Sequence, residues 1–102
     1  MTLLNPRVLP ESLEKWVAKA HALAKKSENV YWDAPHVQRR MRERRVTIQQ
    51  ILDVLRQGKG IDGPTVDKYG DLRIKLRRFS AGRNVQVVVV IKEDHLEVVT
   101  VI

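Results

Sequence analysis

The residues in this sequence best suited to chemistry are one histidine and two arginines. His36, Arg40 and Arg44 are spaced at i, i+4 and i+8, so a helix would place them in a single stripe. Histidine exchanges protons near neutral pH, and arginine supplies fixed donors that fit phosphate oxygens. The combination suits RNA cleavage, which needs a base for the 2′-hydroxyl, an acid for the leaving 5′-oxygen and cations for the phosphorane.

The second proton-transfer group of such a site is less well defined. Its candidates are Glu43, Tyr69 and Lys75. We expect His36, Arg40 and Arg44 to be the catalytic residues, without a metal or other cofactor. The alternative is that His36 only makes a local hydrogen bond in the first turn of its helix. The arginines would then form a solvated face or pair with acids such as Glu43 and Asp53.

The helices that carry this stripe are bounded by clear signals. Asp33 and Pro35 mark the start of the basic helix. Thr47 and Gln50 form a capping box that starts a second helix. The buried face of this second helix is expected to consist of Ile48, Ile51, Leu52 and Leu55. We expect Gly58 to end it as a left-handed residue.

A further helix is predicted near the N-terminus. It opens at Pro10 and keeps one face apolar, with acids in its first turn and lysines in its last. Residues 1–9 show no periodicity and are expected to form a loose arm. His21 lies near the lysine-rich end of the helix, where a lone histidine is expected to be solvated. Residues 27–33 form a connection, with residues 30–32 expected to plug against the core.

The second half of the chain changes to the period of two that is typical of strands. In residues 72–77 apolar and basic side chains alternate, so one face packs and the other is cationic. Residues 85–91 are typical of a central strand covered on both faces, and residues 96–102 of a last strand. Residues 59–71 predict only a short edge strand, with their aspartates as turn residues. The expected fold is α+β, with two to three helices on a three- to four-stranded antiparallel meander.

Length and charge restrict the class of protein. A chain of 102 residues with 43% hydrophobic content fits one small domain. We divide it into an N-terminal arm and helix, residues 1–28, and a core, residues 33–102. The net charge of +7 favours a polyanion or an acidic protein as partner. The RNA backbone is expected to be bound by Arg73, Lys75, Arg77, Arg78 and Arg83.

Several other function classes are unsupported by the sequence. It contains no cysteine, which excludes a disulfide framework, a thiolate zinc site and a cysteine nucleophile. It also lacks a Gly-rich phosphate loop, a Gly-x-Ser-x-Gly elbow and a His-Glu-x-x-His zinc helix. No segment approaches the roughly 20 apolar residues that span a bilayer, and the start does not resemble a signal peptide. We therefore expect a cytoplasmic protein with no membrane partner.

The same two helices also permit functions of other classes. A short helix, a tight corner and a second helix beginning Ile-Gln-Gln are similar to a helix-turn-helix, in which Gln49 or Gln50 would read adenine. The apolar residues of the second helix and the β-rich remainder argue against this DNA-binding alternative. A third alternative is a non-catalytic interaction module, whose basic face or strand edge engages an acidic partner.

The order His-x-x-x-Arg-Met-x-x-Arg-x-Val, an amphipathic helix ending in Gly and strands closing with Val-Val-Thr-Val together resemble a family of small bacterial domains of unknown function. That family is similar to the RelE-like and BrnT-like toxins of type II toxin–antitoxin modules. The resemblance covers about residues 33 to 102. It rests on His36, Arg40, Met41, Arg44, Val46, Gly58 and Thr100.

The resemblance implies a RelE/BrnT-like fold and an activity as a messenger-RNA endoribonuclease, on free RNA or on the ribosome. It also implies a cognate antitoxin protein as partner. Two positions depart from the family. Arg45 stands where Gly is usual, so we expect the corner between the helices to differ. Thr100-Val101-Ile102 stands where many relatives end in Tyr, an aromatic residue suspected to act in the site of RelE-like toxins.

Overall fold

The computed structural model describes residues 12–102, which fold as an α+β unit, as predicted. Residues 1–9 and the predicted helix start at Pro10 lie outside the described residues. The described elements in chain order are α1 (Leu13–Ala24), the 3₁₀ turn η1 (Ser27–Asn29), β1 (Val30–Tyr31), α2 (Pro35–Arg44), α3 (Ile48–Gln57), β2 (Lys59–Val66), β3 (Leu72–Ser80), β4 (Arg83–Ile91) and β5 (Leu96–Val101).

The strands form one sheet in the order β1-β5-β4-β3-β2. Strands β2 to β5 are an antiparallel meander, as predicted. β1 adds a parallel pairing, in which Val30 and Tyr31 lie opposite Leu96 and Glu97 of β5. The sheet is therefore mixed and five-stranded within the described chain, and the prediction of three to four antiparallel strands was wrong. A strand of two residues is too short to show a period of two.

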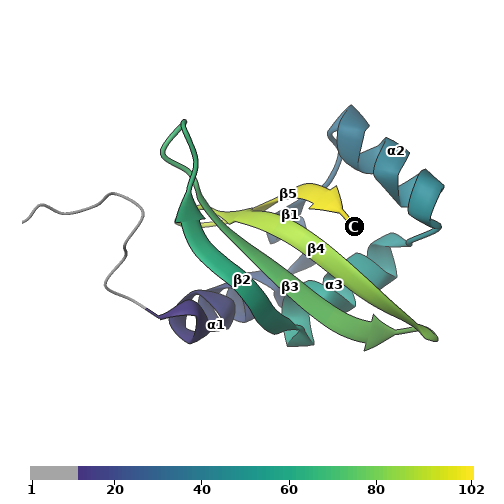
Figure 1. Cartoon of the computed structure of the whole chain (residues 1–102), viewed down its shortest axis with the longest axis horizontal. Helices are drawn as coiled ribbons and strands as arrows, with labels where there is room; N and C mark the ends of the chain where they lie inside the picture. The colour runs from purple at the N-terminus through teal and green to yellow at the C-terminus, as the bar shows by residue number, and fades with distance from the viewer. Residues whose placement is uncertain (1–11) are drawn as a thin grey trace, which may run out of the picture.

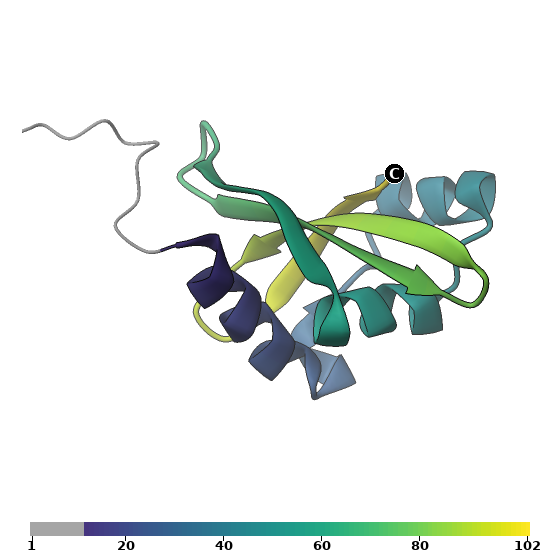
Figure 2. The same ribbon diagram turned by 60° about the horizontal axis from the view of Figure 1, so that its bottom comes forward.

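Two helices cover one face of the sheet (Figures 1 and 2). α1 and α3 lie side by side against this face, and α2 stands beside the end of β5. The fully buried side chains between helices and sheet include Ile51, Leu55, Ile74, Leu76, Val85, Val87, Val89, Leu96 and Val101. Their apolar area, removed from water, is the main stabilising term of this layer.

No helix of residues 12–102 covers the opposite face of the sheet, which we call the open face. Strand register assigns residues to it, because directly paired residues share a face. β4 was expected to be covered on both sides, but Gln86 and Val88 are only half-buried there. The open face contains Lys59, Asp62 and Thr65 of β2, Arg73, Lys75, Arg77 and Phe79 of β3, Asn84, Gln86, Val88 and Val90 of β4, and Glu97 and Thr100 of β5.

α3 begins as the sequence predicts. Thr47 Oγ1 accepts from the Gln50 backbone N–H at 3.1 Å, and Gln50 Oε1 accepts from the Thr47 N–H at 2.9 Å. The end of the helix corrects the prediction for Gly58, which is extended (φ −71°, ψ 159°) and not left-handed. A Cβ atom there would clash with the Val54 carbonyl oxygen. Glycine is thus required for space and not for a positive φ.

The corner between α2 and α3 is closed by Arg45. Its backbone is left-handed (φ 55°, ψ 46°), and its N–H and that of Val46 bond to carbonyls of the last turn of α2. This is the conformation that glycine adopts without strain. The expectation that arginine here changes the corner is therefore not supported, because the arginine adopts a glycine-like conformation.

The predictions for the segment after α3 and for His21 of α1 are corrected by the structure. β2 is a strand of eight residues and not a short edge strand. His21 is not merely solvated, because its Nε2 lies 2.9 Å from the Gly58 carbonyl oxygen and it is half-buried. The prediction of turn residues is confirmed for Asp67, since its Oδ1 accepts from the N–H groups of Tyr69 and Asp71. It is wrong for Asp62, which lies within β2 opposite Lys75.

Candidate functional site

The basic helix α2 is fixed to the outer edge of β5. Ile102 N–H donates to the Gln86 carbonyl, and Val101 lies opposite Val87. Along an antiparallel ladder, residues alternately point their backbone N–H and C=O groups toward the partner strand and away from it. Those of Val101 therefore point away from β4. Arg40 Nε donates to the Val101 carbonyl oxygen at 3.3 Å, and Val37 of α2 is buried. The helix therefore takes the place that a neighbouring strand would occupy.

His36 lies at this edge between two polar partners. Its Nε2 is 3.3 Å from Thr100 Oγ1, and Arg39 donates to its Nδ1 at 3.2 Å. A guanidinium group only donates, so Nδ1 is the acceptor and the proton of a neutral imidazole lies on Nε2. That proton is then donated to Thr100. The local hydrogen bond that was the alternative for His36 is thus present, in the contact with Arg39. The second contact, with Thr100, joins the helix to the last strand.

The predicted catalytic stripe is only partly assembled. His36 and Arg40 both contact β5, and Arg40 also pairs with Glu43 at 3.2 Å. Arg44 is exposed at the other end of the helix, about 12 Å along the axis from His36. Arg39, by contrast, touches His36 directly and was not predicted. The i, i+3 spacing of the two residues was the available signal.

A row of residues crosses the open face from this site. Thr100 lies opposite Val88, Val88 opposite Lys75, and Lys75 opposite Asp62. Neighbouring strands are about 4.8 Å apart, so the backbones of Thr100 and Lys75 are separated by about 10 Å. His36 at one end and Lys75 near the other therefore border a floor formed by Val88.

The cations of β3 differ in their partners. Arg73 Nε contacts Asp67 Oδ2 at 3.0 Å. Backbone N–H groups of Asp71 and Tyr69, together with this arginine, hold the pKa of Asp67 below its usual value, although partial burial opposes them. Lys75 and Arg77 form no ion pair within residues 12–102. These two cations remain available to an anion on the open face.

Two residues predicted to bind RNA lie elsewhere. Arg78 is on the helix-covered face, where its Nε contacts Asp53 Oδ1 of α3 at 2.9 Å. Arg83, at the turn between β3 and β4, donates to the Arg45 carbonyl at 3.3 Å. The predicted set of five cations is therefore not one surface, since only Arg73, Lys75 and Arg77 share the open face.

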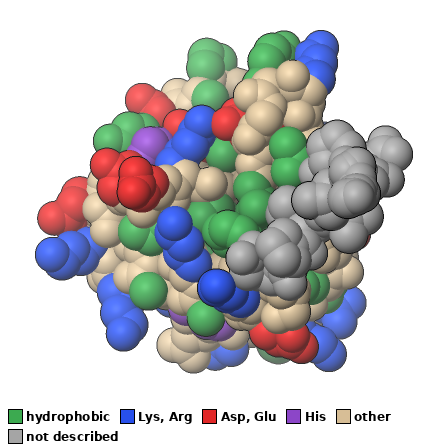
Figure 3. Space-filling view, turned by 90° about the vertical axis from the view of Figure 1, so that its left-hand side faces the viewer, with side chains coloured by type: hydrophobic (Ala, Val, Ile, Leu, Met, Phe, Trp, Pro, Cys, Tyr) green, Lys and Arg blue, Asp and Glu red, His purple; other side chains and the backbone are tan. Residues whose placement is uncertain are grey.

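The end of the molecule with the turn between β2 and β3 has mixed charge, as Figure 3 shows. Lys92 pairs with Asp71 at 2.6 Å. His95 lies between Asp94 (2.7 Å) and Glu97 (2.9 Å). Hydrogen bonds to these two carboxylates raise the pKa of His95 above its usual value. This end does not offer the uncompensated positive charge found around Lys75 and Arg77.

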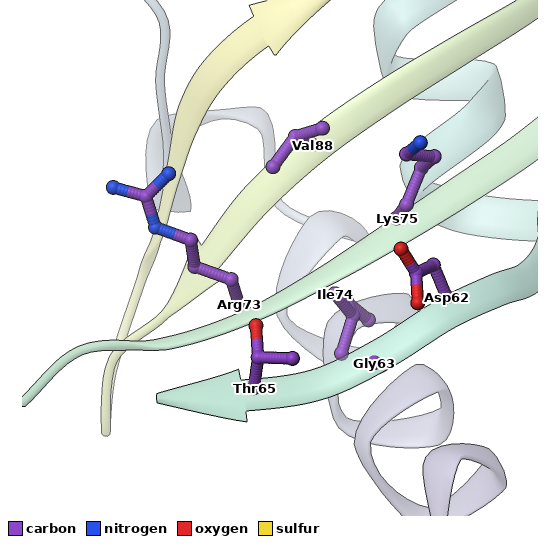
Figure 4. Close-up of a pocket in the computed structure, with 7 residues that line it drawn as sticks. All are labelled: Asp62, Gly63, Thr65, Arg73, Ile74, Lys75 and Val88. Atoms are coloured by element: carbon purple, nitrogen blue, oxygen red, sulfur yellow. The ribbon is translucent and has the colours of Figure 1, made fainter. Parts of the chain in front are cut away.

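A hollow of about 120 Å³ opens on the open face next to Lys75 (Figure 4). It lies between β2 and β3, and Val88 of β4 contributes to its lining. Its other lining residues are Asp62, Gly63, Thr65, Arg73, Ile74 and Lys75.

The three candidates for a second proton-transfer group are in different places. Lys75 is in the row that begins at Thr100, whereas Tyr69 is 75% exposed in the turn between β2 and β3. Glu43 is bound to Arg40. Within residues 12–102 no group of three or more His, Asp or Glu side chains is placed to hold a metal ion. No helix in this part of the chain has the length and apolarity to cross a membrane.

The helix-turn-helix alternative depended on Gln49 and Gln50. Gln50 is buried, and its Nε2 donates to the Ser80 carbonyl of β3 at 3.1 Å while its Oε1 accepts from the Thr47 N–H. It is therefore not available to a base edge. Gln49 remains exposed.

Comparison with known proteins identifies the family. No curated protein and no solved structure matches the chain. Residues 34–102 match the family described as domain of unknown function (DUF4258). The match begins just before α2 and includes α3 and strands β2 to β5, so α1 and β1 lie outside it. Because it covers more than half of the chain, the protein belongs to this family of domains of unknown function.

Proposed function

We propose that this protein is a RelE/BrnT-like toxin that binds RNA on the open face and cleaves it without a metal ion. The observation that carries the proposal is the position of His36. It contacts Thr100 at one end of a row that also holds Lys75, which has no ion-pair partner in the described chain. The cytoplasm as its location rests on the sequence pattern described above, and an antitoxin as its partner rests on the resemblance to the toxins alone.

The proposed chemistry begins with the hydrogen bond from Arg39 to His36. A substrate phosphate is a stronger acceptor for a guanidinium than a neutral imidazole is. Its arrival would draw Arg39 away and leave His36 Nδ1 free to accept the proton of the 2′-hydroxyl. Thr100 would continue to accept from Nε2 and so keep the ring oriented.

The remaining steps use cations already described. The 2′-oxygen forms a bond to phosphorus as the bond from phosphorus to the 5′-oxygen breaks. Lys75 would protonate the leaving 5′-oxygen, and Arg39 and Arg40 would stabilise the charge on the phosphorane. We favour Lys75 over Tyr69 and Glu43 because it shares the row with Thr100. Arg44 and Arg77 would bind phosphates further along the RNA strand.

The test is cleavage of single-stranded RNA by the purified full chain in the presence of a chelator, with and without added ribosomes. The wild-type protein is expected to cleave. His36→Ala is expected to lose cleavage by about a thousandfold, the effect of a missing general base. Arg42→Ala is the matched control, because Arg42 is an exposed cation on the same helix. Unchanged cleavage by His36→Ala would refute the site, and no cleavage in either condition would refute the activity.

A DNA-binding function is the weaker alternative. Of the two glutamines that could read adenine, Gln50 is occupied by Thr47 and Ser80. A non-catalytic module that binds an acidic protein would use the same open face. A stable complex with an acidic protein that nuclease treatment does not disrupt, without RNA cleavage, would favour this role.

A further inference from the structure

The hollow beside Lys75 has a chemistry that phosphate binding does not explain. Figure 4 shows the side chains of Asp62, Thr65, Arg73 and Lys75 around it, with Val88 beyond them. Only one of these groups is anionic. A carboxylate among cations on an RNA-binding face weakens phosphate binding, so its presence suggests a different ligand group.

The hollow is formed by the irregular path of β2. The pairing of β2 with β3 shifts in register on both sides of Asp62. Gly63 has a φ of +103°, and a Cβ atom there would lie 2.8 Å from the Arg73 carbonyl oxygen. Glycine is therefore needed for the backbone of β2 to pass close to β3 at this point. The bulge leaves the space between Asp62 and Thr65 open to solvent.

The walls of the hollow suit a flat ring with donors on one edge. Val88 supplies apolar surface on the open face. Asp62 lies opposite Lys75 in the register but forms no ion pair with it within residues 12–102. Its two oxygens accept hydrogen bonds and donate none. For scale, an enclosed cavity of about 150 Å³ holds one benzene molecule, so this open hollow of about 120 Å³ admits the edge of a base.

We propose that the hollow binds a guanine base of the RNA, read by Asp62. Guanine presents two adjacent donors, N1–H and the N2 amino group, on its Watson–Crick edge, and a carboxylate accepts both. Uracil presents a single donor on that edge, and cytosine and adenine present an amino group beside an acceptor. Because Asp62 follows Lys75 in the row from Thr100, the guanine lies next to the cleaved phosphate. This inference rests on the proposed function.

The test measures binding separately from cleavage. Fluorescence anisotropy is recorded for the full-length protein with 2′-O-methyl oligouridylates that carry one central guanine, inosine, adenine or cytosine and cannot be cleaved. The wild-type protein is expected to bind the guanine oligomer about tenfold more tightly than the inosine oligomer, which lacks the N2 amino group. Asp62→Asn is expected to abolish this ratio. It should bind plain oligouridylate at least as tightly as the wild type, because a negative charge has been removed.

The control is Glu93→Gln, which removes an exposed acid in the turn between β4 and β5. It is expected to keep the guanine-to-inosine ratio. Wild-type binding without a guanine preference, or a preference that persists in Asp62→Asn, would overturn the inference and leave the proposed function standing. Failure of the wild-type protein to bind any of the oligomers would overturn both.

Discussion

His36 Nε2 lies 3.3 Å from Thr100 Oγ1, which joins the first turn of α2 to the last strand across 64 positions of sequence. Since Arg39 occupies Nδ1, Thr100 is the group that receives the Nε2 proton. Arg39 therefore fixes the tautomer of the imidazole, and Thr100 fixes its orientation. In the proposed mechanism, His36 held in this way accepts a proton at Nδ1 once Arg39 moves to a substrate phosphate.

The contact predicts a positioning role for Thr100. Thr100→Val keeps the shape of the side chain but removes its hydroxyl, so the ring is no longer oriented. We expect kcat for RNA cleavage to fall about tenfold with KM nearly unchanged, and Thr100→Ser to restore kcat. Steady-state kinetics with a labelled RNA measures both. A Thr100→Val protein with wild-type kcat, or a Thr100→Ser protein as slow as Thr100→Val, would contradict the role.

Arg77 and Arg78 are neighbours in β3 that point to opposite faces, and they form a matched pair for the RNA surface. Arg77→Gln is expected to weaken RNA binding and to reduce the slope of log K against log salt by about 0.7, the value for one phosphate contact with a single strand. Arg78→Gln should leave both unchanged. Because Arg78 pairs with Asp53 in a half-exposed position, its loss should instead cost about 0.5 kcal/mol of unfolding free energy. Equal effects of both variants on RNA binding would refute the face assignment.

The parts of the fold that were predicted correctly depend on local patterns. Thr47 and Gln50 are three residues apart, and the capping box between them forms as expected. The alternation along β3 likewise predicted that Arg73, Lys75 and Arg77 share a face. These patterns are read within one turn or one strand, where the geometry of the backbone fixes which residues are neighbours.

The parts that were missed depend on three-dimensional contacts that sequence patterns do not report. Gly58 is a glycine because Val54 leaves no room for a Cβ atom, and neither sequence pattern nor propensity reports that space. The role of Arg39 depends on Thr100, which directs His36 Nδ1 back toward α2. Arg78 is paired by Asp53 of another element. Strand register, shifted by the irregularity next to Val88, decides which residues complete the site.

Phe79 is 65% exposed at the end of the cationic strand, and we expect it to stack on an RNA base. An exposed aromatic ring contributes little to stability but offers a flat surface to any base. Phe79→Ala is therefore expected to weaken single-stranded RNA binding about tenfold, with the unfolding midpoint unchanged. Tyr69→Ala is the control, because Tyr69 is 75% exposed but lies in the turn between β2 and β3. Similar losses in both variants would argue against a specific stacking site.

Arg45 has a left-handed backbone (φ 55°) at the end of α2, a conformation that costs a residue with a Cβ atom roughly 1–2 kcal/mol. Glycine avoids this cost but gains flexibility in the unfolded chain. We expect Arg45→Gly to raise the free energy of unfolding by about 0.5–1 kcal/mol. Arg44→Gly, inside the last helical turn, should lower it by about 1 kcal/mol. Urea unfolding of both variants measures these free energies. Destabilisation by Arg45→Gly would show that the arginine side chain stabilises the corner.

The position of His95 between Asp94 and Glu97 makes stability depend on pH. Both carboxylates raise the pKa of His95 above its ordinary value of 6.5. A group whose pKa is raised by folding stabilises the protein below its unfolded pKa, and this contribution disappears as the pH rises through the folded pKa. His95→Gln should therefore cost more stability at about pH 5.5 than at about pH 8.5.

The loss of the ring contact with Tyr31 (4.6 Å between centroids) is common to both pH values, so the difference between them isolates the charge. Thermal unfolding of the wild-type protein and of His95→Gln measures it. Asp94→Asn is the control, since it removes the first of the two carboxylates, and it should show part of the same pH dependence. A His95→Gln loss that is equal at both pH values would mean that the imidazole is not protonated between its two carboxylates.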